Sequence, residues 1–447
     1  MDKEKQQKQF NKMTSEPIGT LLLGLSIPTI ISMMVTNIYN IVDTAFVGTL
    51  GTSESAATGI VFGYMAILQA LAFMCGQGAG SIMSRRLGAK DIKEATKFAS
   101  TGFFMSFSLG LIVAVLTYIF MDPLLILMGS TSTIAPYARI YIIYILLSAP
   151  FFTSSFTMNN LLRYEGKAKL GTVGMMTGAV LNICGDYVLM FVLKLGIAGA
   201  GISTAVSQFI SFAILLFMFL SGKTQTKISI KYVANDFASI FEIVAVGFPS
   251  LLRQGLNSIS TMLLNRCAAV YGDEAVAAMS IVSRISFFPM SVAIGIGQGF
   301  QPISSFNFGA NRKDRVREAF WTAFVASEIV LLIISIPIYL FSGNLIQLLR
   351  DDNEVIRIGI RALHLMCVGQ LFIPLTMMVE MGFQSTGAKL YATFASSLRS
   401  GLLLIPTLLM LTKLRGLSGI QESQPLSFIF TFIVCIWLCK KYLDRLK

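Results

Sequence analysis

The sequence predicts an all-α polytopic membrane protein with twelve transmembrane helices arranged as two six-helix lobes. Of its 447 residues, 54% are apolar and only 13% are charged, and the mean hydropathy is +0.71. Soluble proteins carry roughly 25% charged residues. The composition therefore excludes a soluble enzyme, a secreted domain and a disordered scaffold.

Twelve apolar runs are each long enough to cross a bilayer, which takes about 20 residues of helix. A helix satisfies its own backbone hydrogen bonds in lipid, whereas an open strand leaves them unmet. The expected spans are 18–46, 56–83, 98–121, 137–162, 171–193, 197–220, 241–266, 276–304, 319–341, 356–384, 390–411 and 419–438.

Basic residues give the chain a net charge of +12 and lie mostly in alternate loops between the apolar runs. Positively charged loops stay on the cytoplasmic side of a membrane. This pattern predicts that both tails, 1–17 and 439–447, are cytoplasmic. The basic residues are spread over short loops rather than gathered on one face of a domain, so no nucleic acid is expected as a partner.

An internal repeat becomes visible when the chain is shifted by 221 residues. The shift superimposes Pro28 on Pro249, Gly51 on Gly272, Gly76-Gln77-Gly78 on Gly297-Gln298-Gly299, and Gly88-Ala89 on Gly309-Ala310. We therefore expect an N-lobe at 18–220 and a C-lobe at 241–438, joined by a cytoplasmic linker at 221–240. Six helices per repeat give both lobes the same orientation, related by a pseudo-two-fold axis along the membrane normal. In transporters such repeats enclose a central site.

Two carboxylates of the N-lobe lie inside apolar runs beside amide side chains. Asp43 follows Thr36 and Asn40 at helical spacing. Asp186 follows Asn182 by four residues. Each spacing places its residues on one helix face, and a charge near the bilayer centre costs at least about 2.5 kcal/mol and persists mainly for function. We predict a proton or cation site; the alternative is that both carboxylates end their helices among lipid headgroups.

Further polar residues occur in other apolar runs and are additional candidates for functional residues. In the N-lobe they include the hydroxyl and amide side chains Ser203, Thr204, Ser207 and Gln208; in the C-lobe they include Ser250, Arg253, Gln254, Asn257, Thr261 and Arg284. Glu328 and Glu380 also lie in the C-lobe runs, and their roles are left open. Arg284 and Glu328 could equally form a structural pair, and Glu380 could lie at the membrane interface.

Catalytic motifs find no support in this sequence. His364 is the only histidine, which excludes most zinc sites. The chain has neither a G-x-S-x-G nucleophile elbow nor a complete phosphate-binding loop. We expect no enzyme activity, no cofactor and no ATP-driven transport.

Several motifs resemble those of the multidrug and toxic compound extrusion (MATE) family. They are Asn37-Ile38-Tyr39-Asn40-Ile41-Val42-Asp43-Thr44, Leu181-Asn182 with Asp186, Gly196-x-x-Gly199, Gly297-Gln298-Gly299-Phe300-Gln301-Pro302-Ile303 and Asn307-Phe308-Gly309-Ala310. The pattern is most similar to the bacterial branch that includes MepA-type multidrug exporters and relatives of DNA-damage-inducible protein F.

That resemblance implies an antiporter of a bacterial cytoplasmic (inner) membrane that expels organic cations in exchange for H⁺ or Na⁺. Its cation site, including any Na⁺, would comprise Asp43, Asn182, Asp186 and Thr204, and its substrate cavity would involve Thr36, Asn37, Asn40, Gln208, Arg253, Gln254, Asn257 and Arg284. Some family members carry carboxylates on the seventh helix where this chain has Gln254 and Asn257, which favours protons. The implied partners are small-molecule drugs or metabolites, the coupling ion and membrane lipids, with a monomer as the expected state.

Alternative functions remain open at this point. Arg253 and Arg284 would suit a flippase for a lipid-linked saccharide, whose cavity would favour basic residues. A passive channel would conduct without a coupling ion, and a membrane-embedded transferase would need a catalytic set that the residues do not offer.

Overall fold

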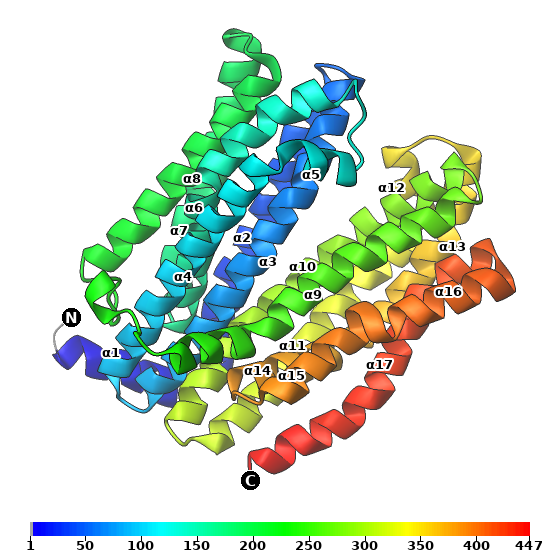
Figure 1. Cartoon of the computed structure of the whole chain (residues 1–447). Helices are drawn as coiled ribbons and strands as arrows, with labels where there is room; N and C mark the ends of the chain where they lie inside the picture. The colour runs from blue at the N-terminus through cyan, green and yellow to red at the C-terminus, as the bar shows by residue number, and fades with distance from the viewer. Residues whose placement is uncertain (1–2) are drawn as a thin grey trace. The chain divides into compact units, whose positions relative to one another are not determined.

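The computed structural model describes residues 3–447, and every element in that part of the chain is a helix (Figure 1). The elements are α1 (Lys3–Ser15), α2 (Ile18–Gly48), α3 (Thr52–Gly88), α4 (Ile92–Ile119), α5 (Met121–Leu127), α6 (Ala135–Tyr164), α7 (Ala168–Asp186), η1 (Tyr187–Val192), α8 (Gly196–Leu220), η2 (Ile230–Tyr232), α9 (Phe237–Ala269), α10 (Asp273–Gly309), α11 (Lys313–Leu340), α12 (Ser342–Leu349), α13 (Asn353–Gln370), α14 (Ile373–Ser385), α15 (Lys389–Ser397), η3 (Leu398–Leu402), α16 (Leu404–Arg415) and α17 (Leu417–Arg445).

The predicted membrane spans are confirmed with one broken helix among them. Eleven helices of the described chain are long and apolar enough to cross a membrane, and α13 with α14 supplies a twelfth when this pair is taken as one span. The pair bends by 49° at residues 371–372. Pro374 lies in the first turn of α14; it has no N–H to donate to the carbonyl of Gln370 four residues before it, and its ring clashes with a helical carbonyl at that position. The break therefore has a local cause in the sequence.

The chain folds into two compact units, and a boundary between them falls at the same place in each sequence repeat. The first unit holds α1 and Ile31–Leu251, and the second holds Glu16–Ile30 and Leu252–Lys447. Both divisions fall two residues after a proline inside a helix, Pro28 in α2 and Pro249 in α9. The compact units thus differ from the expected lobes, 18–220 and 241–438, because the first half of α2 and the first half of α9 each pack outside their own repeat.

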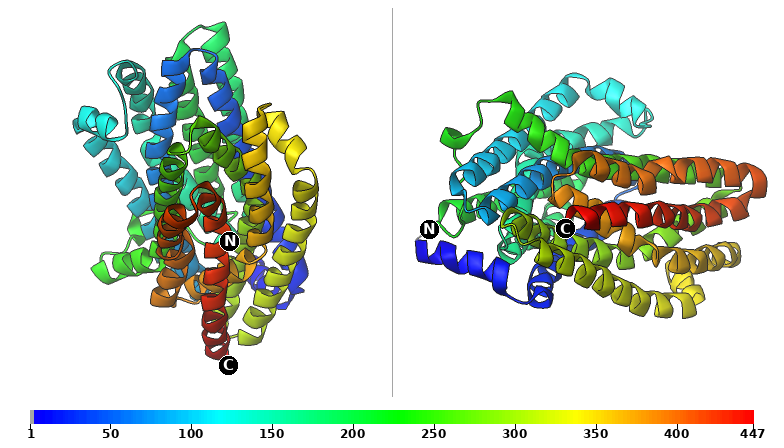
Figure 2. Two further views of the ribbon diagram at one scale, coloured as in Figure 1. Left: turned by 90° about the vertical axis from the view of Figure 1, so that its right-hand side faces the viewer. Right: turned by 90° about the horizontal axis from the view of Figure 1, so that it is seen from below.

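Close helix contacts account for this division. In the first unit, α9 lies so near α3 that a Cβ on Gly247 would be 1.9 Å from the Met74 carbonyl oxygen. In the second unit, a Cβ on Gly299 of α10 would be 2.1 Å from Ser26 Oγ of α2. Small residues allow helix backbones to approach this closely in membranes. Elsewhere in the second unit α16 and α17 form an antiparallel pair joined at Gly416 (Figure 2).

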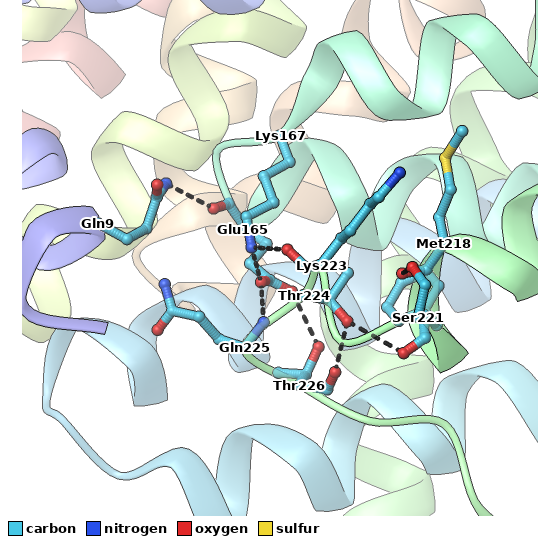
Figure 3. Close-up of polar contacts among 10 residues, drawn as sticks. Gln9, Glu165, Lys167, Met218, Ser221, Lys223, Thr224, Gln225 and Thr226 are labelled. Atoms are coloured by element: carbon cyan, nitrogen blue, oxygen red, sulfur yellow. Dashed lines mark hydrogen bonds and ion pairs between the residues drawn. The ribbon is translucent and has the colours of Figure 1, made fainter. Parts of the chain in front are cut away.

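The linker between the repeats is fastened to the first unit by the buried carboxylate of Glu165, which follows α6. Lys167 Nζ lies 2.7 Å from one carboxylate oxygen, and Thr226 Oγ1 donates to the other at 3.0 Å. The backbone N–H of Gln225 also donates to this carboxylate, and the Gln9 side chain of α1 donates to the Glu165 carbonyl at 3.0 Å (Figure 3). The linker ends at residue 236, since α9 begins at Phe237.

We expect Glu165→Gln to destabilise the protein by about 2 kcal/mol, because hydrogen bonds to a charged group contribute more than neutral ones. The change would leave Lys167 without its counter-ion and weaken the two bonds from the linker. The measurement is the thermal denaturation of the purified protein in detergent. Asp122→Asn is the matched control, since its ion pair with Arg139 is exposed and exposed pairs contribute little. Equal melting temperatures for the two variants would contradict this role of Glu165.

Candidate ion and substrate site

Two carboxylates meet inside the first unit. Asp43 lies near the end of α2 and Asp186 ends α7, and their exposed fractions are only 2% and 0%. Their side chains are near enough to interact with each other. After Asp186 the helix continues as the π-helical segment η1, and such widened turns occur frequently at functional sites.

The Asn182 amide, one turn before Asp186 on α7, connects the carboxylates to α8. Asn182 Nδ2 lies 3.4 Å from Asp186 Oδ1 and 3.2 Å from Thr204 Oγ1 of α8. Ser203 Oγ donates to the Asn182 carbonyl at 2.9 Å. The sequence-predicted set of Asp43, Asn182, Asp186 and Thr204 is therefore brought together from three helices.

Three acceptor oxygens of this cluster are buried without a hydrogen-bond donor among the described residues: Asp43 Oδ1, Asp186 Oδ2 and Asn182 Oδ1. A buried acceptor without a donor costs about 1–3 kcal/mol. Two ionised carboxylates also repel each other strongly where water is excluded. A proton, or a small cation that prefers oxygen ligands, would relieve both costs. No group of three or more His, Cys, Asp or Glu side chains in the described chain is placed to hold a metal ion.

Two tyrosines of the cluster were missed by the sequence analysis. Tyr39 lies one helical turn before Asp43 on α2, and Tyr141 lies on α6; both are buried and interact electrostatically with Asp43. The four-residue spacing of Tyr39 and Asp43 could have indicated the first contact. No sequence signal singled out Tyr141, which lies in a span among other tyrosines, Tyr137 and Tyr144.

A small cavity of about 10 Å³ adjoins the ion cluster, and Asn182 is part of both. It is lined by Thr36, Tyr39, Phe156, Met175, Gly178, Ala179, Asn182, Gln208 and Ser211. This space holds about one water molecule. Of the residues predicted for a substrate cavity, Thr36 and Gln208 lie in the lining of this space, whereas Asn37 and Asn40 are half-buried and are not among its lining residues.

A family model described as MatE matches this chain twice, over residues 28–188 and 249–410. The matches begin at Pro28 and Pro249, which the internal repeat superimposes, and together they cover most of the chain. The chain belongs to the MatE family. The resemblance to this family in the sequence motifs is thereby confirmed.

Relatives of this MatE chain have names that state an export function. The multidrug export protein MepA of Staphylococcus aureus (strain MSSA476) is 27% identical over 422 residues, covering 94% of this chain and 92% of that protein. MepA of Staphylococcus haemolyticus (strain JCSC1435) is 28% identical over 427 residues, covering 92% of each. A solved outward-facing structure of a multidrug resistance MATE family transporter of the MOP superfamily matches with a TM-score of 0.92 at 24% identity, covering 97% of this chain and 98% of that one. This last likeness supports the fold.

The predicted C-lobe residues of this MatE protein lie in the second unit, in different environments. Arg253 is buried and paired with Glu380, which is itself buried inside the protein. Gln254 is half-buried, while Asn257 and Arg284 are exposed. Arg399, which the sequence analysis did not single out, lies 3.8 Å from Glu380.

Proposed function

We propose that this MatE-family protein is a secondary active multidrug antiporter, which exports cationic amphipathic compounds in exchange for protons. The observation that carries the proposal is the buried pair Asp43 and Asp186, whose unpartnered oxygens adjoin a cavity through Asn182. The names of the MepA relatives point to the same activity. Na⁺ at Asp43, Asn182, Asp186 and Thr204 is the second candidate for the coupling ion.

The coupling follows from the charge of the carboxylate pair. When the pair is ionised, it attracts a cationic substrate; when it has bound protons, that attraction is lost and the substrate leaves. The ion and the drug then favour different states, which is the thermodynamic requirement for exchange. Each inward-moving proton supplies about 2.3 kcal/mol per 100 mV and about 1.4 kcal/mol per pH unit.

The cavity chemistry suits flat, positively charged compounds. Tyr39 and Phe156 provide aromatic surfaces, which attract cations in sites shielded from water. Met175 adds a flexible side chain that adapts to different shapes. This combination supports a broad substrate range rather than a single ligand.

The proposed setting is a bacterial cytoplasmic membrane with both termini in the cytoplasm. The basic residues of the alternate loops support this orientation. We propose a monomer as the working unit, because the ion cluster and its cavity are both completed within one chain.

A flippase for a lipid-linked saccharide is the second candidate function. It is favoured by the buried Arg253 and Arg399 of the second unit, since basic groups suit the phosphates of such a substrate. A flippase would move a lipid from one leaflet to the other whether or not the dye is present.

The test is reconstitution of the purified protein in liposomes that contain an ethidium-like dye, with pH and Na⁺ gradients applied separately. Dye movement driven by the pH gradient alone supports the proposal, and movement driven by Na⁺ alone transfers the coupling to Na⁺. Dye movement that needs neither gradient indicates a passive channel. No dye movement under either gradient would contradict the proposed function.

Asn182→Ala is expected to uncouple the carboxylate pair from the cavity, because the Asn182 amide contacts Asp186 and also lines the cavity. We compare the dissociation constants of the dye at pH 6 and at pH 8. We expect the ratio of these two constants to be about tenfold smaller in the variant than in the wild type, the effect of losing one buried hydrogen bond. The measurement is dye affinity by fluorescence titration at both pH values. Asn37→Ala is the control, since Asn37 is on α2 outside the cavity lining. An unchanged pH dependence in Asn182→Ala would count against coupling through this residue.

A further inference from the structure

The second unit contains a buried group of charged side chains that the proposed antiport cycle does not use. Arg253 of α9, Glu380 of α14 and Arg399 of η3 have exposed fractions of 8%, 1% and 6%. Arg253 Nη1 lies 2.6 Å from one Glu380 oxygen, and Arg399 Nη2 lies 3.8 Å from the other. We call these three residues the arginine cluster.

The arginine cluster is not electrically balanced. Two guanidinium groups, which stay protonated at any ordinary pH, share a single carboxylate. Glu380 makes its short contact, 2.6 Å, with Arg253, and its contact with Arg399 is longer, at 3.8 Å. Arg399 Nη1 is buried and has no hydrogen-bond partner among the described residues. The remaining ionisable neighbour, Cys435, is a buried thiol.

A buried charge whose only ion pair is long, and which keeps an unsatisfied donor, is costly unless a further counter-charge completes it. Replacing such an arginine by an apolar residue would remove that cost, so a purely structural cluster would gain nothing from Arg399. An arginine that binds a ligand, in contrast, needs an N–H donor that has no acceptor within the protein. Arginine is suited to this role because its planar fork matches the two oxygens of a carboxylate or phosphate.

The backbone around Arg399 is arranged specifically for this position. Residues Leu398–Leu402 form the π-helical segment η3, which interrupts the helix between α15 and α16. Ser260 Oγ of α9 donates to the Ser400 carbonyl at 2.6 Å, which ties the widened turn to the helix that carries Arg253. In the first unit the π-helical segment η1 follows Asp186 in the same way. Each unit therefore has a widened turn beside its buried charges, acidic in the first unit and net basic in the second.

We infer that Arg399, together with Arg253, binds an oxyanion, the carboxylate or phosphate group of an organic molecule. Arg399 Nη1 and Nη2 donate hydrogen bonds to the incoming oxygens. Glu380 keeps its contact with Arg253 and competes with the ligand for both guanidinium groups. The inference rests on the proposed transport function and adds a substrate class to it, namely compounds with an acidic group, including zwitterions.

The first experiment measures oxyanion binding by the purified full-length protein in detergent. Inorganic phosphate and benzoate are titrated while the thermal denaturation is followed by intrinsic tryptophan fluorescence. We expect a saturable rise of the melting temperature in the wild type and a loss of affinity of about tenfold or more in Arg399→Gln. Arg357→Gln is the control, because Arg357 is exposed and pairs with Glu354 at the surface. Identical titrations for the wild type and Arg399→Gln, or no response in the wild type, overturn the inference.

A second variant separates binding from a structural role and remains informative if Arg399→Gln fails to fold. Glu380→Gln removes the internal competitor, so phosphate and benzoate should bind at least about fivefold more tightly. A merely structural ion pair predicts no gain in affinity, and that result also overturns the inference. Both titrations are independent of dye transport, so failure of the antiport proposal would be recognised separately.

The source of the oxyanion is distinguished in nanodiscs. If the natural ligand is a lipid phosphate, phosphatidylglycerol nanodiscs stabilise the wild type over Arg399→Gln more than phosphatidylcholine nanodiscs do, and benzoate competes. If the ligand is a soluble organic anion, the two lipids give the same difference and benzoate adds to it. Either pattern supports the oxyanion site, whereas equal stability of both proteins in every condition contradicts it.

Discussion

Replacing Asp43 or Asp186 by asparagine is expected to lower gradient-driven efflux by at least about 100-fold, while the protein still inserts in the membrane and folds. Asparagine keeps the shape of the side chain but neither releases nor takes up a proton, so the charge of the pair no longer follows the proton gradient. Both positions are buried beside unpartnered acceptors. A neutral amide adds donors there, so stability should be kept or raised.

The measurement is dye efflux from energised vesicles with the amount of inserted protein quantified in parallel. Glu328→Gln is the matched control, because Glu328 is a half-buried carboxylate of the span α11 and lies in the other compact unit. It should retain efflux near the wild-type rate. Wild-type efflux in both Asp43→Asn and Asp186→Asn would refute the assignment of the ion site.

The same pair of variants bears on the coupling ion. If protons couple transport, each asparagine variant should still bind dye in the absence of a gradient, because the cavity walls are unchanged. Binding should no longer respond to pH in the variant that has lost the titrating group. Normal pH dependence together with lost efflux would place the proton site elsewhere in the chain.

The spans and the residues of the candidate ion site could be singled out from sequence because their signals are local. Hydropathy marks a span within a single run of about 20 residues. The spacing of Asn182 and Asp186 places both on one helix face, and burial of a charge marks function. Only the meeting of Asp43 with Asp186 required information across helices, and the family resemblance supplied it.

The remaining features could not be predicted because they depend on contacts between distant segments. Tyr141 reaches Asp43 only through the packing of α6 against the first unit. The boundaries of the compact units depend on the close approach of α9 to α3 and of α2 to α10. Arg399 is a different case, since a charge within the predicted span 390–411 was itself a usable signal that the sequence analysis passed over.

Gly247→Ala is expected to destabilise the first unit more strongly than any other single methyl addition discussed here. Its Cβ would lie 1.9 Å from the carbonyl oxygen and 2.7 Å from the carbonyl carbon of Met74. Both atoms belong to the backbone of α3, so the clash cannot be relieved by a side-chain rotation. Forcing extra atoms into packed helices costs about 1–3 kcal/mol and more where the backbone must move. We therefore expect a loss of at least about 3 kcal/mol.

Thermal denaturation of the purified protein in detergent measures this effect, and a melting temperature lower by at least about 5 °C is expected. Gly255→Ala is the matched control on the same helix, because no atom lies within 4 Å of its added Cβ. Alanine is preferred over glycine inside a helix by about 0.5–1 kcal/mol, so this variant should be as stable as the wild type or slightly more so. Similar melting temperatures for the two variants would mean that α9 does not pack against α3 in the membrane protein, and the division of the chain at Leu251 would lose its physical basis.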